Sequence, residues 1–489
     1  MRLSKLAETV TGKEYAFEGI KEECEICRLF TDSREKTEKG LFFCLVGENT
    51  DSHECVLEAI KNGAVAVVTE RKLEVNIPQI IVANTREALA KMSAVFYGDP
   101  SLHMKVIGIT GTNGKTTTSY MVASILEKAG KKVGIIGTLG VIYGRKKIDS
   151  GLTTPDPIFL QKTLAEMFIF GVEYVVMEVS AHALFYKKVA GVHFSACIFT
   201  NFTQDHLDFF GTMQAYKNAK LTLFKENVCP IAIINGDDEV GREIGAVREK
   251  VKEKTVFYGL NTPADAFAII TDETLYGSEC MLNVNDALCR ITLSMAGIHN
   301  VYNALAASLC VSELGIESEF ITQGLSSMKQ VCGRLEKVGD YNGGDIYVDF
   351  AHTPDGLEKS LQALRKHCKA RLICLFGCGG NRDKAKRPLM GEIAAKTSDF
   401  AILTSDNPRY EDPLDIISDV EKGYRRFSVR YVVVPERKKA LDYAMGCLKK
   451  GDVLLVAGKG GEEYQEIMGI KYPFNDHDII EKWLQEKKK

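Results

Sequence analysis

The segment from residue 108 to residue 126, GITGTNGKTTTSYMVASIL, combines residue types that can bind a phosphate group. A strand-like run, KVIGIT, leads into a glycine turn, and an amphipathic helical pattern then runs from Lys115 to Gly130. Backbone N–H groups at such a helix start face an anion, Lys115 adds positive charge, and the hydroxyl of Thr116 can hold Mg²⁺. These features predict a nucleotide-binding loop.

The spacing of this loop differs from that of the common nucleotide loop, because Gly108 stands one residue too early relative to the Gly-Lys pair. A glycine turn between a strand and a helix can also be purely structural. The lysine and the threonines that follow favour a nucleotide. We therefore expect phosphate binding by Gly111, Thr112, Asn113, Gly114, Lys115, Thr116 and Thr117.

Acidic and histidine side chains follow two further strand-like runs. Glu178 comes directly after EYVVM, and Asp205, His206 and Asp208 follow SACIFTNF. A single His-Asp cluster is usually a hydrogen-bonded polar turn. Two such groups at strand ends beside a phosphate loop are more typical of a Mg²⁺ site.

The elements that position these residues belong to a long globular chain. A chain of 489 residues is longer than one hydrophobic core usually accommodates, so its length predicts two to four domains. The composition is 45% hydrophobic and 26% charged, with Lys+Arg 62 against Asp+Glu 65. This balance gives no bias towards nucleic acid or a membrane surface. With no apolar run long enough to span a bilayer and no apolar core near the start, we expect a cytoplasmic protein without membrane insertion.

The chain divides into three blocks of alternating strand-like and helix-like segments. We predict an α/β fold with a small α/β domain over residues 1–103, a central domain with a mostly parallel sheet over 104–332, and a C-terminal Rossmann-like domain over 333–489. Residues 255–296 predict a β-rich addition to the central block. The fourteen cysteines lie mostly in apolar runs, so buried thiols are favoured over disulfides or a metal site.

The sequence GTNGKTT resembles the ATP loop of the Mur ligases and folylpolyglutamate synthases, which are ATP-dependent amide-forming enzymes. The resemblance extends over nearly the full length, with at least six motifs in order. It implies ATP and Mg²⁺ as cofactors, with Lys115, His206 and Lys220 in catalysis. The metal ligands that it implies are Thr116, Glu178, His206 and Lys220.

Lys220 raises an electrostatic problem, because the resemblance places an ammonium beside a divalent cation. At about 4 Å and an effective dielectric constant of about 20, each unit of like charge costs roughly 4 kcal/mol. The family removes this repulsion by carbamylating the lysine, so Lys220 is expected to be N6-carboxylysine. Without the resemblance, Lys220 would be interpreted as a solvated helix lysine.

Two other stretches resemble the segments that contact ATP in this family. Asn300 and Asn303 in AGIHNVYNALAA are three residues apart and share a helix face, where a cap and a surface residue would be the structural interpretation. CGRLEKV and VDFAHTPDGL add Arg334 and Asp349 as candidates.

The tetrapeptide Asp406-Asn407-Pro408-Arg409 resembles the turn that marks Mur ligases using meso-2,6-diaminopimelate. Asn-Pro is also ordinary turn chemistry. Diaminopimelate carries one carboxylate more than lysine, so Arg409 and Arg382 could supply forked hydrogen bonds. Glu462 could balance the distal ammonium, and Gly458 would let the backbone approach the ligand. Two buried arginines without that carboxylate would be costly in a lysine-adding enzyme.

The acceptor end resembles the same enzymes. The residues implied for the UDP-precursor are Thr31, Ser33, Glu48, Asn49, Thr50, Thr153, Thr154, Ser180, Tyr186 and Lys188. Three features depart from the family pattern. Tyr186 and Lys188 replace a glutamine and an arginine, Leu152 replaces a polar residue of some members, and Gly461 replaces a histidine.

The resemblance implies a monomeric ligase that adds meso-2,6-diaminopimelate to UDP-N-acetylmuramoyl-L-alanyl-D-glutamate through an acyl phosphate, without nucleic acid as a partner. A lysine-adding enzyme or a divergent paralogue acting on a modified precursor is the nearest alternative. Folylpolyglutamate synthase accounts less well for the first block and the Asp-Asn-Pro-Arg turn. A P-loop NTPase acting as a switch or binding module would hydrolyse ATP without making an amide.

Overall fold

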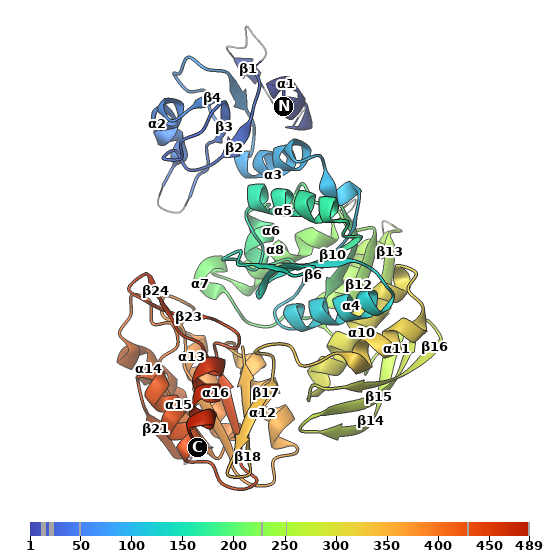
Figure 1. The fold of residues 1–489 in the computed structure, drawn as a ribbon, viewed down its shortest axis with the longest axis vertical. Coiled ribbons are helices and arrows are strands. Elements are labelled where there is room, and N and C mark those ends of the chain that lie inside the picture. The colour runs from blue at the N-terminus through green and yellow to red at the C-terminus, as the bar shows by residue number, and fades with distance from the viewer. Residues whose placement is uncertain are drawn as a thin grey trace. The chain divides into compact units, whose positions relative to one another are not determined.

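The structure is a computed structural model that describes residues 1–10, 16–18, 24–47, 50–225, 228–250, 252–427 and 430–487. It confirms an α/β fold whose helices alternate with strands of largely parallel sheets (Figure 1). The chain forms two compact units. The first contains residues 1–108, 131–197 and 222–230, and the second contains residues 109–130, 198–221 and 231–489. The three-domain division at residues 103 and 332 stays a prediction.

The N-terminal sheet lies in the first unit and has the strand order β1-β5-β4-β3-β2. Strands β2 to β5 are parallel, and β1 runs antiparallel to β5. Helices α1 and α3 contribute to the core on one face and α2 to the core on the other, so the central strands β3 and β4 consist mainly of apolar residues. The bounds are α1 Leu3–Ala7, β1 Ala16–Glu18, β2 Arg28–Phe30, β3 Gly40–Phe43, α2 Val56–Lys61, β4 Ala64–Thr69, β5 Gln79–Ile81 and α3 Thr85–Phe96.

The second sheet has eleven strands in the order β16-β15-β14-β13-β12-β11-β6-β10-β7-β8-β9. Strand β7 pairs in parallel with β10, β12 with β13, and β13 with β14. At the two edges, β7-β8-β9 and β14-β15-β16 are antiparallel. The strands are β6 Lys105–Thr110, β7 Val133–Gly137, β8 Gly140–Tyr143, β9 Lys146–Ile148, β10 Tyr174–Glu178, β11 Phe194–Phe199, β12 Ile231–Asn235, β13 Lys254–Tyr258, β14 Ala266–Thr274, β15 Gly277–Val284 and β16 Ala287–Leu293.

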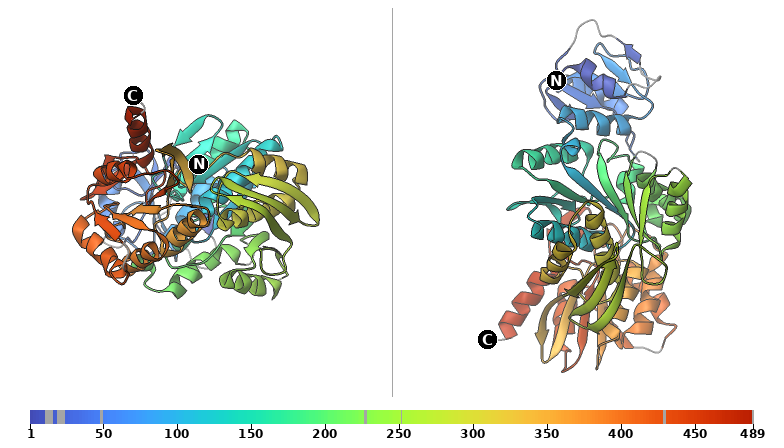
Figure 2. Two further views of the ribbon diagram at one scale, coloured as in Figure 1. Left: turned by 90° about the horizontal axis from the view of Figure 1, so that it is seen from below. Right: turned by 90° about the vertical axis from the view of Figure 1, so that its right-hand side faces the viewer.

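The helices of this region are α4 Lys115–Lys128, α5 Pro157–Phe170, α6 Ala181–Phe185, α7 Leu207–Phe210, α8 Met213–Leu221, α9 Glu239–Lys250, α10 Ile298–Glu313 and α11 Ser318–Ser327. The sequence predicted an amphipathic α4, but α10 and α11 both pack against it and bury nine of its residues. The β-rich segment is confirmed. Figure 2 shows its long strands β14, β15 and β16 beside α10 and α11.

The C-terminal sheet has the order β17-β18-β22-β19-β20-β21, with all pairs parallel except β17 with β18. Helices α12, α13 and α14 cover one face, and α15 and α16 cover the other. The bounds are β17 Glu336–Tyr341, β18 Gly344–Asp349, α12 Pro354–Arg365, β19 Leu372–Phe376, α13 Lys386–Thr397, β20 Phe400–Leu403, α14 Pro413–Tyr424, β21 Arg430–Val433, α15 Arg437–Gly446, β22 Val453–Ala457 and α16 Asp476–Lys487. A separate hairpin consists of β23 Tyr464–Ile467 and β24 Ile470–Pro473.

The prediction of buried thiols is confirmed for nine of the fourteen cysteines. Cys27 and Cys332 are the two exposed ones. No helix within the described residues is long and apolar enough to cross a bilayer.

Candidate active site

Two glycines shape the turn between β6 and α4. Gly111 has φ +146° and a Cβ there would lie 1.8 Å from Thr200 Oγ1. Gly114 has φ +87° and a Cβ would lie 2.5 Å from Asn303 Oδ1. Both the backbone angles and the close contacts require glycine. The GTNG turn therefore holds backbone against neighbouring side chains at the start of α4.

Two lysines meet inside this turn. Lys115 Nζ donates to the carbonyl oxygens of Gly111 at 2.9 Å and Thr112 at 2.8 Å. Lys220 Nζ, from α8, donates to the same Gly111 oxygen at 2.7 Å. Lys220 is fully buried, and burial together with the charge of Lys115 holds its pKa well below the ordinary value. Its burial beside the phosphate loop corrects the interpretation of Lys220 as a solvated helix lysine, and the lowered pKa favours loss of its proton.

A charged group centred on Asp205 lies beside α7. Its carboxylate is 3.2 Å from His206 Nε2 and 3.9 Å from both His352 Nε2 and Lys386 Nζ. Burial raises the pKa of Asp205, but the neighbouring His206, His352 and Lys386 outweigh burial and leave the pKa well below its ordinary value. His206 precedes α7 with a left-handed backbone, φ +55°, and its ring is partly exposed. Asp205 orients His206 rather than standing free as a ligand.

Asn300 and Asn303 are both buried on α10, unlike a cap and a surface residue. Asn303 Nδ2 donates to Asn300 Oδ1 at 3.2 Å, which confirms their shared face. Asn303 Oδ1 also accepts from Thr118 Oγ1 at 3.3 Å on α4. The pair therefore lies against the first turns of the phosphate-loop helix.

Arg334 approaches the same helix from the chain segment before β17. Its Nη2 donates to Thr116 Oγ1 at 2.8 Å, and the guanidinium lies 4.5 Å from the centre of the Phe350 ring. Asp349, the last residue of β18, is buried. It accepts from Leu335 N at 2.6 Å and from Ser360 Oγ at 2.9 Å, so it holds the Arg334 segment in place.

Glu178, in the other compact unit, ends β10 among the residues predicted to hold the acceptor. It accepts from Thr138 N at 2.9 Å and from Thr138 Oγ1 at 3.1 Å. Thr154 Oγ1 donates to the Glu178 carbonyl oxygen at 2.8 Å and accepts from Ser180 N at 3.0 Å. Thr153 Oγ1 lies 3.2 Å from Thr138 Oγ1. One hydrogen-bonded network thus joins four of the predicted residues.

Tyr186 and Lys188 follow α6 and have protein partners. Arg86 lies over the Tyr186 ring, with its guanidinium carbon 4.3 Å from the ring centre. Lys188 Nζ is 2.7 Å from the exposed Asp156 carboxylate.

The remaining acceptor candidates belong to the N-terminal sheet. Thr31 and Ser33 follow β2, and Ser33 Oγ donates to Glu58 Oε2 at 2.5 Å. Thr50 O accepts from Gly47 N at 2.7 Å. Glu48 and Asn49 lie outside the described residues.

The Asp-Asn-Pro-Arg turn follows β20 and meets the loop after β22. Asn407 Nδ2 donates to Glu462 Oε2 at 3.0 Å, and a Cβ at Gly458 would lie 2.6 Å from Asp406 Oδ2. That Asp406 oxygen is buried and, within the part of the chain that is described, has no hydrogen-bond partner. The turn and the loop therefore form one polar site with an unused buried acceptor.

Lys459 belongs to this site and was missed from the sequence. It is fully buried and its Nζ donates to Asn407 Oδ1 at 3.0 Å and Glu462 Oε2 at 2.9 Å. Glu462 therefore already has a cationic partner. The only signal in the sequence was the lysine within GKGGEE, three residues before Glu462.

The two arginines differ from the buried pair that the sequence predicted. Arg409 is largely buried, with Nε bound to Glu466 Oε2 at 3.0 Å and Nη1 to Gly380 O at 2.8 Å. Only its Nη2 end can still meet a ligand. Arg382 is half exposed and its Nη1 lies 3.5 Å from Asp208 Oδ2. Arg409 already pairs with Glu466 and Arg382 is half exposed, so the cost of burial does not by itself require a ligand carboxylate at either arginine.

Arg387, which the sequence analysis did not identify, supports the segment after the Asp-Asn-Pro-Arg turn through Glu411. Its buried guanidinium donates to both oxygens of Glu411, at 2.9 and 3.0 Å, and to Asp419 at 3.0 Å. Glu411 in turn accepts from Asn381 N. The Arg387 hydrogen bonds lower the pKa of Glu411 to about 2.

The depressed pKa of Glu411 predicts that its ion pair with Arg387 is sensitive to acid. Its contribution to the free energy of unfolding is present above about pH 4.5, the ordinary value, and is lost as the pH falls towards 2. Urea unfolding of the protein and of Glu411→Gln should therefore differ at pH 6 and converge at low pH. Glu486→Gln, an exposed control near the C terminus, should show a pH-independent difference. If the difference in the free energy of unfolding between the protein and Glu411→Gln were unchanged at low pH, the stabilising role of the Arg387–Glu411 ion pair would be contradicted.

Two family models match the chain. The model described as Mur ligase middle domain matches residues 109–311, and the model described as Mur ligase, glutamate ligase domain, matches residues 333–460. Together they include the phosphate loop, the Asp205 group and the Asp-Asn-Pro-Arg turn.

Similar proteins match along nearly the whole chain. A UDP-N-acetylmuramoyl-L-alanyl-D-glutamate–2,6-diaminopimelate ligase 1 of Clostridium acetobutylicum is 44% identical over 94% of this chain and 95% of its own length. The ligases of the same name from Clostridium botulinum and Geobacillus thermodenitrificans are 44% and 39% identical, over 97% and 95% of this chain and 98% and 96% of theirs. The chain therefore belongs to the Mur ligase family.

Solved structures agree with this assignment. The structure of a UDP-N-acetylmuramoyl-L-alanyl-D-glutamate–2,6-diaminopimelate ligase has a TM-score of 0.68 and 29% identity, over 95% of this chain and 96% of its own. MurF from Acinetobacter baumannii shares the fold, with a TM-score of 0.65 and 23% identity over 93% of this chain and 95% of that one.

Proposed function

We propose that this protein is an ATP-dependent ligase that joins meso-2,6-diaminopimelate to UDP-N-acetylmuramoyl-L-alanyl-D-glutamate in peptidoglycan precursor synthesis. The names of the relatives, at 37–44% identity over nearly the full chain, support this function. The observation that carries the chemistry is the meeting of the Lys115 and buried Lys220 amines on one carbonyl oxygen of the phosphate loop.

The reaction proceeds in two steps. An oxygen of the D-glutamate γ-carboxylate attacks the terminal phosphorus of ATP, and ADP leaves with the electrons of the broken P–O bond. The amine of diaminopimelate then attacks the acyl carbon, phosphate leaves, and the nitrogen loses a proton as the amide forms. Both steps need positioning and charge neutralisation rather than a protein nucleophile.

The residues around the phosphate loop suit ATP. Lys115 turns from the loop carbonyls to the phosphate oxygens, Arg334 adds charge at Thr116, and the N–H groups of residues 111–117 face the anion. Asn300 and Asn303 meet the adenine. Asp349 acts indirectly by fixing the Arg334 segment.

The donor set also fits Mg²⁺, because hydroxyl, carboxylate and carbamate oxygens are ligands that this hard cation prefers. Thr116, Glu178, His206 and a carbamylated Lys220 would hold it. The buried Lys220 amine supports this fit, since a neutral amine can add CO2 and become an oxygen ligand. When bound, Mg²⁺ would neutralise charge on the transferring phosphoryl group.

The acceptor is bound by the network around Glu178, with Thr153, Thr154, Ser180, Tyr186 and Lys188, and by Thr31, Ser33 and the loop of residues 47–50. Lys188 in place of an arginine offers a point charge rather than a fork, so it contacts a phosphate or carboxylate less specifically. The short hydrogen bond from Ser33 to Glu58 keeps the segment after β2 in a fixed conformation.

Diaminopimelate binds at the Asp-Asn-Pro-Arg turn. Arg409 Nη2 meets its distal carboxylate, and the unpartnered Asp406 Oδ2 accepts from an ammonium. Glu462, already paired with Lys459, serves mainly to position Asn407. We also propose the three-domain division at residues 103 and 332, a monomer, and a cytoplasmic location, with no nucleic acid or membrane partner.

The decisive experiment incubates the protein with ATP, Mg²⁺, the UDP-muramoyl-dipeptide and either diaminopimelate or lysine. We expect the amide product by mass spectrometry and phosphate release at least about a hundredfold faster with diaminopimelate, because lysine leaves charged pocket groups unpaired. Equal rates would overturn the choice of amine. ATP hydrolysis that ignores both acceptor and amine would indicate an NTPase switch and overturn the ligase function.

A further inference from the structure

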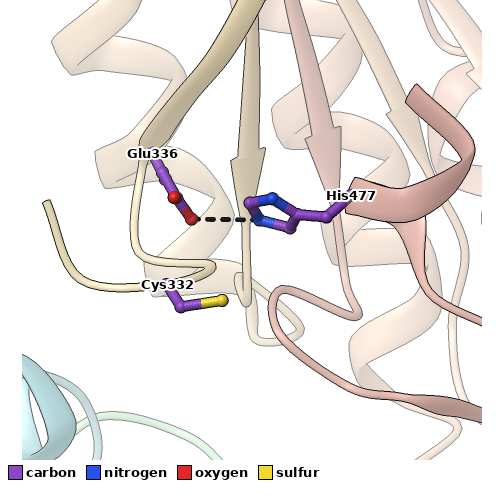
Figure 3. A group of neighbouring side chains, drawn as sticks. All are labelled: Cys332, Glu336 and His477. Carbon is purple, nitrogen blue, oxygen red and sulfur yellow. Dashed lines mark ion pairs between the residues drawn. The ribbon is translucent and has the colours of Figure 1, made fainter. Parts of the chain in front are cut away.

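Three side chains with different donor atoms converge outside the ligase site. Cys332 and Glu336 lie at the segment before β17 and at its first residue, and His477 lies in the first turn of α16. Figure 3 shows the three side chains pointing toward one another. One sulfur, one oxygen and one nitrogen atom, contributed by the three residues, all lie within 4.8 Å of one another.

The histidine of this cluster faces the carboxylate and the thiol with a buried ring nitrogen. His477 Nε2 lies 3.0 Å from Glu336 Oε2 as an ion pair. The nitrogen is nevertheless buried and has no partner with hydrogen-bond geometry in the described part of the chain. A buried ring nitrogen that faces a thiol and a carboxylate without an aligned hydrogen bond has the arrangement of a metal ligand.

We propose that Cys332, Glu336 and His477 bind a divalent transition metal of the zinc class. A thiolate is a ligand that Zn²⁺ prefers and that Mg²⁺ does not, so the sulfur of Cys332 would make this site distinct in its chemistry from the metal site of the ligase. Three protein ligands leave one position of a tetrahedral ion to water.

The backbone on both sides of the cluster is already held in place. Glu336 Oε2 accepts from Gly333 N at 2.7 Å, and Gly333 O accepts from Phe350 N at 2.9 Å. Beside His477, the carboxylate of Asp476 is bound by the buried Arg437 at 2.6 and 2.9 Å. At Zn–S about 2.3 Å and Zn–N or Zn–O about 2.0–2.2 Å, tetrahedral ligand atoms lie roughly 3.3–3.7 Å apart. The side chains reach these separations by small rotations.

The position of the cluster suggests what the metal would do. Arg334 lies between Cys332 and Glu336, and its guanidinium reaches Thr116 on the phosphate-loop helix. A metal bound to both neighbours and to α16 would restrict the backbone that carries Arg334. Under the proposed ligase function, the loaded protein should therefore show a changed KM for ATP with little change in kcat. Metal binding itself does not depend on that function.

A proton on His477 competes with a metal ion for this cluster. The nearby Cys332 thiol and Glu336 carboxylate raise the pKa of His477 to about 10, so without metal the three groups form a charged cluster around an imidazolium. Metal binding must then displace protons from the histidine and the thiol. This alternative predicts no metal affinity at the cluster.

The test uses the full-length protein after treatment with a chelator, with Mg²⁺ present and Co²⁺ as the probe. We expect one equivalent of Co²⁺ to give a thiolate-to-cobalt charge-transfer band that Zn²⁺ removes. Cys332→Ser and His477→Gln should each abolish the band and weaken Zn²⁺ binding by about a hundredfold or more. If His477→Gln fails to fold, the exposed Cys332→Ser substitution still decides the outcome.

Matched controls exist elsewhere in the chain. Cys27→Ser removes the other exposed thiol, and His367→Gln removes a histidine that lies 3.9 Å from Glu273 outside any such cluster. Both controls should keep the band. A native protein with no thiolate band, or a band that persists in Cys332→Ser, would overturn the site. Neither result depends on whether the protein is active as a ligase.

Discussion

Lys220→Ala is expected to lower kcat by about a thousandfold while ATP still binds, because the change removes charge stabilisation of the transferring phosphoryl group. Lys220 is buried, and burial together with the charge of Lys115 at the same Gly111 carbonyl lowers the pKa of its amine, which favours the neutral form. A neutral buried amine is the form that attacks CO2, loses a proton and becomes a carbamate. The carbamate, rather than the amine, is the group that the reaction requires.

Measurement of kcat by phosphate release, together with ATP binding by a fluorescent nucleotide, separates catalysis from binding. Lys217→Ala is the matched control, because Lys217 lies on the same helix but pairs with Glu243 at 2.8 Å. It should retain kcat within about twofold, as surface pairs contribute little. Unchanged kcat in Lys220→Ala would refute the role of the lysine.

The carbamate itself can be tested without substitution. Removing CO2 from the buffer should reduce activity, and bicarbonate should restore it; ¹³C-labelled bicarbonate should give one carbamate NMR signal that Lys220→Ala lacks. Lys220→Arg should also be inactive, because a guanidinium stays charged and cannot be carbamylated. Full activity in CO2-free buffer together with an active Lys220→Arg would contradict the modification.

The strands of the parallel sheets could be predicted because they are buried on both faces and end in turn residues. DIYVDFAH, RLICLFGCGG and DVLLVAGKGG became β18, β19 and β22, with their predicted ligand loops at the carboxyl ends. Short exposed elements escaped prediction. The hairpin β23–β24 is exposed and irregular in composition, yet its Glu466 binds Arg409.

The contacts between distant segments could not be predicted from spacing. Nothing local in the sequence distinguishes Lys459 or Arg387, whose burial depends on carboxylates three to 32 residues away. Likewise, Asp349 has the residue type of a ligand contact, but its oxygens are used by the backbone and Ser360. Residue type and strand position located the sites, whereas folding decided which polar atoms remain available to a ligand.

Arg409→Asn should reduce kcat/KM for diaminopimelate by about a hundredfold or more, since loss of one partner of a largely buried charge pair costs about 2–5 kcal/mol. Asparagine is chosen because Arg409 has φ +52°, which asparagine tolerates better than alanine. The plane of the guanidinium is fixed by Glu466 and Gly380, so Nη2 alone has to meet the distal carboxylate. Most of the loss should therefore appear in KM.

Arg409→Lys and Arg382→Ala complete the experiment. The lysine keeps the charge but not the planar geometry, so it should recover only part of the lost kcat/KM. Arg382 is half exposed and lies at the edge of hydrogen-bond range from Asp208, so its removal should cost less than about tenfold. The slow rate with lysine as the amine should stay nearly the same in Arg409→Asn, because lysine has no distal carboxylate to lose. If Arg382→Ala instead causes the larger loss, or if Arg409→Asn slows both amines equally, Arg409 does not select the amine.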